Sequence, residues 1–259
     1  MKKRIVVKVG SNVLTRTGGK LDVTRISSLV DQIAWLRQHD FEVILVSSGA
    51  VASGRGELRV EHSLDSVEQR QLFSAIGQVK LVGLYYDLFR EHGIHVGQVL
   101  TMKENFRPGE PYDNQRACMS VMLENGVLPI VNENDTVCVT ELMFTDNDEL
   151  SGLIAQMMEA DTLILLSCVD GVYSGPLLAG HSPSVIPVVT PESDISKYIL
   201  DNTSSHGRGG MTSKCQTATR LQQEGIRVII ANGQRENILI DLVERPEEVP
   251  HTEFLPLEN

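Results

Sequence analysis

Lys8 lies where a positive charge is costly unless it meets an anion. It sits in the apolar run IVVKV, directly before Gly10 and Ser11. A lysine in a buried strand needs an anionic partner, although a lysine at a sheet edge can extend its ammonium to solvent. Its position at the end of the run, followed by glycine, favours an anion site.

Lys214 ends the glycine-rich segment GRGGMTSK, which leads into a helical pattern. Glycines let backbone N–H groups approach an anion, and a helix start favours negative charge, so the segment suits phosphate binding. It is not a Walker A motif, because no glycine precedes the lysine and Cys215 stands where that motif needs Ser or Thr. It is not GxGxxG either, because Thr212 takes the last glycine position. The alternative is a flexible surface loop.

Small residues form a third candidate anion site. Ser47, Ser48, Gly49 and Ala50 follow an apolar run and precede a short helical pattern. Such a turn aims backbone N–H groups at an anion. Small residues also serve packing alone at many strand-to-helix turns, so both interpretations stay open here.

Acidic residues gather in one part of the chain. Between Arg116 and Lys197 there is no Lys or Arg, and this gap holds twelve acids, six of them within residues 132–149. One interpretation is a solvated acidic loop over a buried sheet. The other is an acidic site whose cations come from distant lysines, a metal or a substrate ammonium, because close carboxylates without counter-ions repel one another.

Two clusters within this stretch combine amides and carboxylates. Asn132-Glu133-Asn134-Asp135 follows an apolar run, and Asp146-Asn147-Asp148 opens a helical pattern, where one Asp can simply cap the helix. Together they suit an amino-acid substrate, whose ammonium needs acceptors and whose carboxylate needs donors. The seven histidines form no cluster and no Ser/His/Asp order stands out, so a hydrolase triad is not supported.

Composition excludes several classes of protein. The 259 residues carry 23 basic and 34 acidic side chains, a net charge of −11, which argues against nucleic-acid or anionic-membrane partners. No apolar run approaches the ~18 residues of a membrane span. Four separated cysteines without a CxxC pair fit a reducing cytoplasm and no structural zinc. We therefore expect a cytoplasmic protein.

The elements that must position these residues alternate along the chain. Apolar runs predict strands at 4–9, 42–47, 95–101, 127–132, 162–167, 185–189 and 227–231, with a weak hairpin signal at 137–144. Helical spacing predicts helices at 22–39, 66–91, 113–124, 146–159 and 211–224, and residues 238–243 close the domain. This alternation predicts an α/β fold with a largely parallel sheet covered on both faces. Its active site should lie at the carboxyl ends of the strands.

The candidate segments together resemble the amino acid kinase family. The matching segments occur in order over almost the whole chain: VVKVGSNVLT, VSSGAVASGR, GIHVGQVL, VLPIVNENDTV, TDNDELSG, DGVY and GRGGMTSK. NEND with a GGMxxK-type loop is typical of the branch that phosphorylates glutamate. It separates that branch from members that act on acetylglutamate, uridylate or carbamate.

The resemblance implies a three-layer α-β-α sandwich with a mostly parallel central sheet. It implies one domain over 1–259, with glutamate bound by about 1–160 and ATP by about 161–259. The implied reaction is ATP-dependent phosphorylation of the L-glutamate γ-carboxylate, the first step of proline biosynthesis. ATP, Mg²⁺, proline as feedback inhibitor and a homo-oligomer are implied with it. Many bacterial members also carry a C-terminal PUA domain, which we do not expect here.

The resemblance also implies roles for individual residues. Lys8 and Lys214 would bind phosphate oxygens and stabilise the transferring phosphoryl group, and Asp148 would hold these lysines. The residues implied for glutamate binding are Ser48, Asp135 and Asn147. The residues implied for ATP are Lys8, Ser167, Cys168, Arg208, Gly209, Gly210, Met211, Thr212, Ser213 and Lys214. No metal ligand is assigned.

Two of these positions depart from the family's pattern. Cys168 stands where members usually have Asp beside the nucleotide, and Arg208 stands where a small residue is common. The rival hypotheses are an amino-acid-binding regulatory module with an inactive kinase fold, and a kinase of the same fold with another acceptor. Lys8, Lys214 and Asp148 together argue against the first rival, and NENDT with TDND argues for an amino-acid acceptor.

Overall fold

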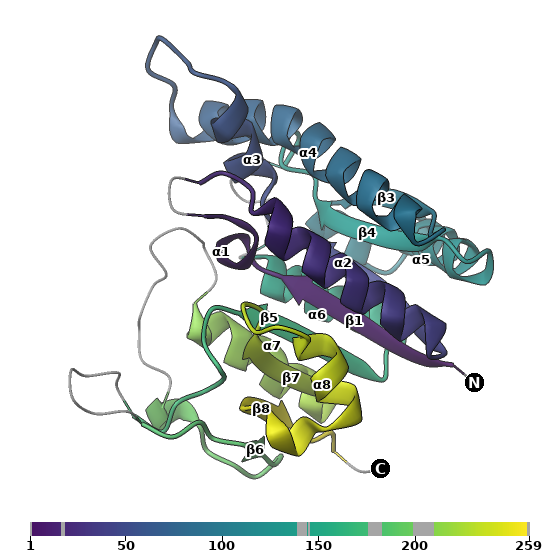
Figure 1. Cartoon of the computed structure of the whole chain (residues 1–259), viewed down its shortest axis with the longest axis vertical. Coiled ribbons are helices and arrows are strands. Elements are labelled where there is room, and N and C mark those ends of the chain that lie inside the picture. The colour runs from purple at the N-terminus through teal and green to yellow at the C-terminus, as the bar shows by residue number, and fades with distance from the viewer. Residues whose placement is uncertain are drawn as a thin grey trace.

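A computed structural model describes residues 2–16, 19–138, 144, 146–175, 183–198 and 210–257. Within this part of the chain the strands form a single sheet in the order β3-β4-β2-β1-β5-β7-β8-β6 (Figure 1). The strands are β1 Lys3–Val9, β2 Phe41–Ser47, β3 Val96–Thr101, β4 Leu128–Glu133, β5 Thr162–Ser167, β6 Val188–Val189, β7 Arg227–Asn232 and β8 His251–Phe254. The predicted α/β class with a mostly parallel sheet is confirmed.

The pairing brings the carboxyl ends of the central strands to one edge. β1 pairs in parallel with β2 on one side and β5 on the other, so that Lys8 lies beside Val46 and Leu165. β5 pairs in parallel with β7, and β7 with β8 antiparallel. The loops after β1, β2, β4, β5 and β7 therefore meet at this edge, as the sequence predicts.

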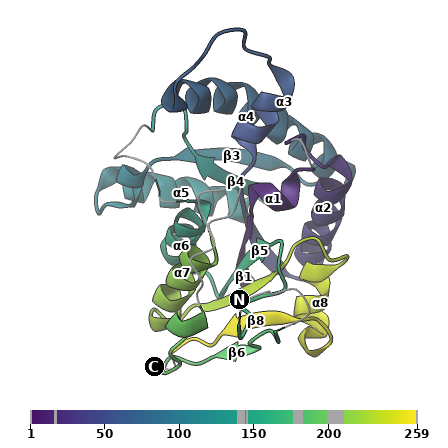
Figure 2. The same ribbon diagram turned by 90° about the vertical axis from the view of Figure 1, so that its left-hand side faces the viewer.

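Helices cover both faces of the sheet. The longer helices are α2 Val23–Gln38, α3 Ala50–Glu57, α4 Ser66–Glu91, α5 Glu110–Glu124, α6 Asn147–Met157, α7 Met211–Gln223 and α8 Ile238–Glu244, and α1 is the single turn Ser11–Leu14. Figure 2 shows α5, α6 and α7 on one side of the sheet and α2 and α8 on the other. Short 3₁₀ turns lie at Lys103–Phe106, Ser196–Tyr198 and Pro246–Glu248.

Alternation along the strands divides the core in two. Val7 and Val9 of β1 pack in the core under α2, α4 and α8, whereas Val6 packs in the core under α5, α6 and α7. Successive strand residues point to opposite faces, so Lys8 shares the face of Val6. Its ammonium is thereby directed toward the α6–α7 layer.

Most predicted elements are found, with small shifts at their ends. The helix at 66–91 has the predicted bounds, since Asp65 and Glu68 form a capping box at its start. α5 begins at Glu110, earlier than residue 113, because Pro111 suits a first helical turn. Within 185–189 only Val188–Val189 forms a strand. The hairpin signal at 137–144 falls largely on residues outside the described part.

Residues 245–259 contain a strand that the sequence analysis did not predict. His251–Phe254 forms β8, which joins β7 to β6 in the same sheet. The Thr252 hydroxyl donates to Ile186 O at 2.7 Å and accepts from Val172 N at 2.8 Å. This segment therefore completes the sheet and holds the loop after β5.

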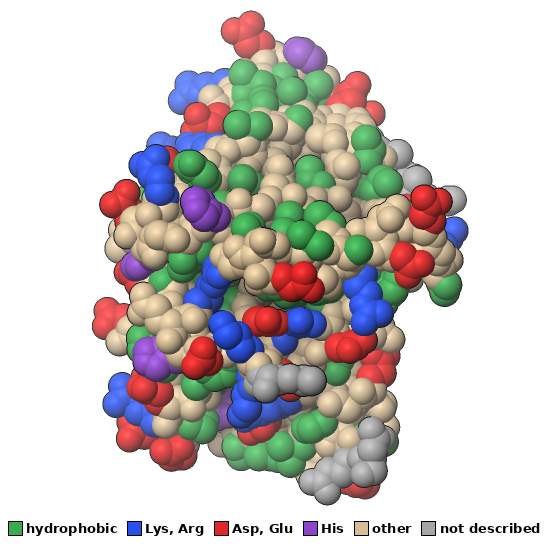
Figure 3. All heavy atoms as spheres, turned by 90° about the vertical axis from the view of Figure 1, so that its right-hand side faces the viewer, with side chains coloured by type: hydrophobic (Ala, Val, Ile, Leu, Met, Phe, Trp, Pro, Cys, Tyr) green, Lys and Arg blue, Asp and Glu red, His purple; other side chains and the backbone are tan. Residues whose placement is uncertain are grey.

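The surface at the amino ends of the strands carries both signs of charge (Figure 3). Arg4 pairs with Glu42 at 2.8 Å, and Arg227 pairs with Glu253. Both pairs are partly buried and join neighbouring strands. Among the described residues, none of the helices combines the length and the apolar character needed to span a membrane.

Candidate active site

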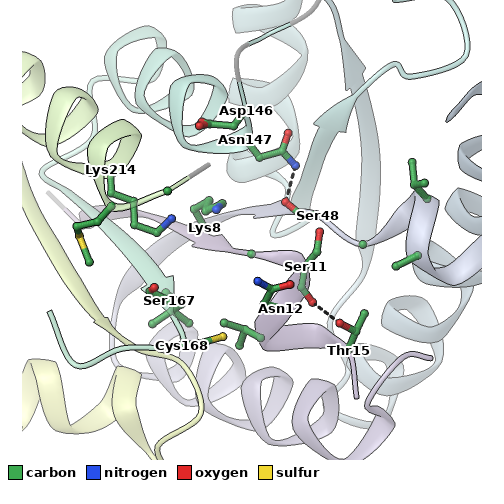
Figure 4. A pocket seen from close by; sticks show the side chains of 18 of the residues that line it. Lys8, Ser11, Asn12, Thr15, Ser48, Asp146, Asn147, Ser167, Cys168 and Lys214 are labelled. Atoms are coloured by element: carbon green, nitrogen blue, oxygen red, sulfur yellow. Dashed lines mark hydrogen bonds between the residues drawn. The ribbon is translucent and has the colours of Figure 1, made fainter. Parts of the chain in front are cut away.

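A cleft of about 830 Å³ opens at the carboxyl edge of the central strands (Figure 4). Its lining includes the ends of β1, β4 and β5 and the starts of α3, α6 and α7. Lys8 and Lys214 point toward one another across it, and Asn147 points toward Ser48. The cleft therefore brings together segments that lie more than half the chain apart.

Asp148 lies between the two lysines. Lys8 Nζ is 2.6 Å from Asp148 Oδ1, and Lys214 Nζ donates to Asp148 Oδ2 at 2.9 Å. Asp148 is 0% exposed, Lys8 5% and Lys214 7%. One buried carboxylate thus fixes both ammonium groups in place.

Local sequence explains how three elements meet at this point. The Asp146 side chain caps α6 by accepting from Asp148 N at 2.8 Å and Glu149 N at 3.0 Å. Asp148 therefore falls in the first turn of α6. Lys214 falls in the first turn of α7, which begins after Gly210. Because α6 and α7 pack on the face to which Lys8 points, the three charges converge.

The charges of this cluster do not cancel. Two ammonium groups contact one carboxylate, so these three side chains carry a net charge of +1, which the buried Asp146 offsets only weakly at Lys8. Burial lowers the pKa of Lys8, although the Asp148 charge opposes that shift. Burial alone would raise the pKa of Asp148, but Lys8 and Lys214 together hold it below its ordinary value. A bound anion would balance the remaining charge, as expected for a phosphate site.

Gly10 leaves room for the Lys8 ammonium. A Cβ at this position would lie 3.4 Å from Lys8 Nζ and 3.7 Å from Leu166 O. The methyl group of an alanine would therefore fit at ordinary van der Waals distance beside the Lys8 ammonium. A larger side chain would crowd the space in front of the lysines.

The turn after β2 carries Ser48 into the cleft. Ser48 N donates to Val9 O at 3.1 Å, which ties the turn to β1. Gly49 has φ of 105°, in the left-handed region that favours glycine, and begins α3. Asn147 Nδ2 donates to Ser48 Oγ at 2.8 Å and to Asn132 Oδ1 at 2.9 Å. The two predicted glutamate-binding residues Ser48 and Asn147 are therefore in direct contact.

Arg70 is a cation of the cleft that the sequence analysis did not single out. It comes from α4 and forms ion pairs with both Glu133 and Asp135. Its side chain is only 15% exposed. Among the described acids of 132–149, Glu133, Asp135, Asp148 and Glu149 pair with cations from distant parts of the chain, Glu149 with Lys103 at 3.4 Å. These pairs fit the interpretation in which distant cations meet the acidic stretch.

The sequence held a signal for Arg70. The buried stripe of α4 contains Phe73, Gly77, Leu81 and Tyr85, and Arg70 precedes this stripe at helical spacing. A charge on the buried face of an amphipathic helix indicates a buried partner. Asp135, predicted to meet glutamate, lines the cleft beside this guanidinium.

The other end of the cleft is lined by Ser167, Cys168, Gly210 and Met211. Burial raises the pKa of the Cys168 thiol, and the two lysines partly offset this shift. Gln234 Nε2 donates to Cys168 Sγ at 3.7 Å. A neutral thiol thus occupies this position, close enough to the two lysines for their charges to act on it.

An ion pair joins the loops after β5 and β7 near this end. Arg235 Nε donates to Asp170 Oδ1 at 2.9 Å, and Asn232 Nδ2 donates to the same oxygen at 3.0 Å. The Arg235 hydrogen bond holds the pKa of Asp170 below its ordinary value. Of the predicted phosphate loop, Arg208 and Gly209 lie outside the described residues. Thr212 and Ser213 lie in the first turn of α7 but do not line the cleft.

Comparison with known proteins identifies related sequences over nearly the whole chain. Residues 3–232 match the amino acid kinase family. A glutamate 5-kinase of Bacteroides thetaiotaomicron is 60% identical over 98% of this chain and 70% of its own length. A glutamate 5-kinase of Chlorobaculum tepidum is 48% identical over 92% of this chain and 65% of its own length. The chain thus spans about two thirds of the length of these curated relatives.

Solved structures share the architecture at low identity. The UMP kinase of Ureaplasma parvum superposes with a TM-score of 0.66 at 16% identity, over 98% of this chain and 99% of that one. The UMP kinase of Bacillus anthracis gives the same TM-score at 15% identity, over 98% and 96%. At such identity the likeness shows the fold alone.

Proposed function

The chain belongs to the amino acid kinase family, and from that premise we propose that it transfers the γ-phosphoryl group of ATP to the side-chain carboxylate of L-glutamate. The product is L-glutamyl 5-phosphate, the first step of proline biosynthesis from glutamate. The observation that carries the proposal is the Lys8–Asp148–Lys214 cluster in the cleft of a chain 60% identical to a glutamate 5-kinase.

Phosphoryl transfer depends on positioning and charge more than on a covalent group. Lys8 and Lys214 would contact the phosphate oxygens, on which negative charge is redistributed as the bond breaks. Asp148 would keep both ammonium groups at fixed positions, so that no reorganisation is needed during the reaction. The attacking carboxylate is already ionised at neutral pH, so no general base is required.

Glutamate would occupy the end of the cleft formed by Ser48, Asn147 and Asp135. The Ser48 hydroxyl can donate to a substrate carboxylate, and the Asn147 and Asp135 oxygens can accept from the ammonium. Asp135 already pairs with Arg70. The substrate ammonium and the guanidinium would share the carboxylates of Asp135 and Glu133.

ATP would occupy the end lined by Ser167, Cys168 and the start of α7. The phosphates would lie against Lys214 and the Arg208–Lys214 loop, and the nucleoside beside the loop after β5. Cys168 offers no negative charge there. We expect Cys168→Asp to retain ATP binding, since family members usually carry an acid at this position.

Mg²⁺ would be held mainly by the ATP phosphates. No group of three or more His, Cys, Asp or Glu forms a metal site among the described residues. Asp146 lines the cleft, and its Oδ2 is buried and accepts no hydrogen bond from a described residue. One carboxylate with substrate phosphates is a usual Mg²⁺ arrangement, so the cleft fits the ion. Bound Mg²⁺ would neutralise charge on the polyphosphate, and activity should therefore vanish when EDTA removes it.

Three further expectations belong to the same proposal. Proline shares the α-carboxylate and ammonium of glutamate, so it should inhibit by competing for the glutamate site. Inhibition by proline that is unchanged at saturating glutamate would contradict this.

We propose a homo-oligomer, which sedimentation at several protein concentrations would test. We also propose the cytoplasm as the location, where ATP is supplied and the four free cysteines remain reduced; fractionation of cells would test it.

An acceptor panel tests the proposed reaction. Hydroxylamine traps acyl phosphates, so ATP-dependent hydroxamate should form with L-glutamate and not with N-acetylglutamate or aspartate. Acetylation removes the charged donor to Asn147 and Asp135, which should lower kcat/KM at least about tenfold. Equal use of glutamate and N-acetylglutamate would overturn the assignment of the acidic end of the cleft, and phosphorylation of UMP alone would overturn the acceptor.

A further inference from the structure

A chain of hydrogen bonds runs from α4 into the glutamate end of the cleft. Asn132 Nδ2 donates to Gln78 Oε1 at 2.9 Å. Asn132 Oδ1 accepts from Asn147 Nδ2 at 2.9 Å, and Asn147 Nδ2 also donates to Ser48 Oγ at 2.8 Å. Gln78 is 9% exposed and Asn132 3%, so water hardly competes for these bonds.

Each amide in this chain fixes the orientation of the next. An amide has a donating nitrogen and an accepting oxygen, and rotation of the amide exchanges them. Because Gln78 presents its oxygen, Asn132 turns its nitrogen toward Gln78 and its oxygen toward Asn147. Asn147 must then turn its nitrogen toward Asn132 and Ser48.

The orientation determines which groups remain for a ligand. Both protons of Asn147 Nδ2 are used, and no hydrogen bond from a described residue reaches Asn147 Oδ1. That oxygen remains as an acceptor. Ser48 Oγ accepts from Asn147, so its own proton is directed elsewhere, and none of the described residues accepts it. The cleft therefore presents one acceptor and one donor side by side, the pair that an α-amino acid requires.

We propose that Gln78 is a positioning residue that sets the donor and acceptor pattern of the glutamate site through Asn132 and Asn147. Gln78 does not line the cleft and so acts only through its neighbours. This inference rests on the proposed function and extends it. It explains how the site distinguishes glutamate from a dicarboxylate of the same length that carries hydrogen in place of the ammonium group.

The test compares variants that separate polarity from shape. Gln78→Met keeps the length of the side chain but removes the acceptor, so Asn132 and Asn147 lose their fixed orientation. Gln78→Glu keeps an acceptor oxygen whether or not its carboxyl is protonated. Gln32→Met is the matched control, because Gln32 of α2 is also buried and hydrogen-bonded, to Ser28 and Leu239, and does not belong to the chain of amides at the cleft.

Glutamate and glutarate, which lacks the ammonium, are the two substrates to compare by the hydroxamate assay. Gln78→Met should raise the glutamate KM about tenfold or more with kcat changed less than about threefold. It should also lower the preference for glutamate over glutarate about tenfold. Gln78→Glu and Gln32→Met should retain both values within about threefold, while thermal melts report any loss of stability.

A normal glutamate KM and preference in folded Gln78→Met would overturn the proposal, as would equal losses in Gln78→Glu. Gln78→Leu provides a second test if Gln78→Met does not fold. It also lacks an acceptor for Asn132 Nδ2, so the same loss is expected, and a normal glutamate KM and preference would again overturn the proposal. Wild-type protein without glutamate-dependent hydroxamate would instead refute the proposed function, and the role of Gln78 with it.

Discussion

At the scale of single residues, the site depends on a buried charge imbalance. Lys8 and Lys214 share one carboxylate, Asp148, in a place almost closed to solvent. An unpaired buried ammonium is costly, so the cluster is adapted to a ligand that brings negative charge. A polyphosphate bound in the cleft supplies that charge where the reaction takes place.

Removal of either lysine should slow the reaction more than it weakens glutamate binding. We expect Lys8→Met and Lys214→Met each to lower kcat by about 10²–10³, because a fixed ammonium binds the transition state more strongly than the ground state. Steady-state kinetics with thermal melts provide the measurement. Lys80→Met is the control, since Lys80 is exposed on α4 and pairs only with Glu57 among the described residues. A near-normal kcat for folded Lys8→Met would place Lys8 outside the reaction.

Asp148→Asn should be slow as well, and it should be less stable. The substitution leaves two like charges side by side without the carboxylate that contacts both. Breaking a buried ion pair in this way costs on the order of 3–5 kcal/mol. Urea unfolding should therefore show a larger loss for Asp148→Asn than for Lys8→Met, which leaves a neutral pair. The reverse order would mean that Asp148 does not hold the lysines.

The pH dependence should reveal the state of Lys8. Burial lowers its pKa in the free protein, so its ammonium is present below that pKa and is lost as the pH rises through it, earlier than for an ordinary lysine. Bound ATP favours the charged form and should raise the pKa again. The alkaline decline of kcat/KM for ATP, which reports free enzyme, should thus occur at lower pH than that of kcat. Lys8→Arg should shift the decline of kcat/KM for ATP to higher pH, because a guanidinium stays charged. If kcat and kcat/KM decline at the same pH, and Lys8→Arg moves neither decline, Lys8 is not their source.

The sequence predicted these three charges but not the residues behind the glutamate site. Lys8 and Lys214 stand in segments whose apolar or glycine-rich neighbours make a cation conspicuous. Gln78 and Arg70 lie within the long helix of residues 66–91, where polar side chains are common on the exposed face. Helical spacing places Arg70 and Gln78 on the buried face of α4, but only their contacts with Glu133 and Asn132 of β4 show which partners they meet.

At the scale of elements, contact between α3 and α4 positions the turn that carries Ser48. A Cβ at Gly54 of α3 would lie 1.9 Å from Phe73 O, and one at Gly77 of α4 would lie 1.8 Å from Ala50 O. The two helices thus pack backbone against backbone. Ala50 directly follows Ser48 and Gly49, so a shift of α3 would move the glutamate site.

Gly77→Ala should disturb both stability and glutamate binding. Because the added methyl group meets backbone, α3 must move, at a cost of about 1–3 kcal/mol. The glutamate KM should rise while the KM for ATP changes little. Gly83→Ala is the control on the same helix, since nothing lies within 4 Å of its added Cβ, and it should be neutral or stabilising by up to about 1 kcal/mol. Urea unfolding and kinetics of both variants test this, and equal behaviour of the two would refute the role of the close contact.

Elements with strong local signals could be predicted, and those that depend on distant partners could not. The helix Ser66–Glu91 carries its own capping box, and β1, β2 and β5 each contain an unbroken run of apolar residues. β8 is four residues long between prolines, and β6 only two, so their pairing depends on β7 and on each other. Such short edge elements owe their conformation to the sheet rather than to their own residues.

At the scale of the molecule, the central sheet joins two ends of one cleft. β1 stands between β2, which leads to the Ser48 turn, and β5, which leads to Ser167 and Cys168. Lys8 in β1 is therefore placed where a phosphoryl donor at one end meets an acceptor at the other. The order of strands was not predictable from the sequence, since it depends on crossovers between distant segments, but the parallel alternation did predict the edge at which the site lies.

The central claim is that a glutamate carboxylate oxygen attacks the γ-phosphorus of ATP in this cleft. Glutamate labelled with ¹⁸O in both side-chain oxygens tests it directly, with hydroxylamine present to trap the product and mass spectrometry of the released phosphate. Phosphoryl transfer makes a labelled oxygen the bridge between carbon and phosphorus, and hydroxylamine then cleaves the bond to carbon. The account predicts phosphate that carries a single labelled oxygen for each hydroxamate formed. Phosphate without label, at the same rate with and without glutamate, would contradict it.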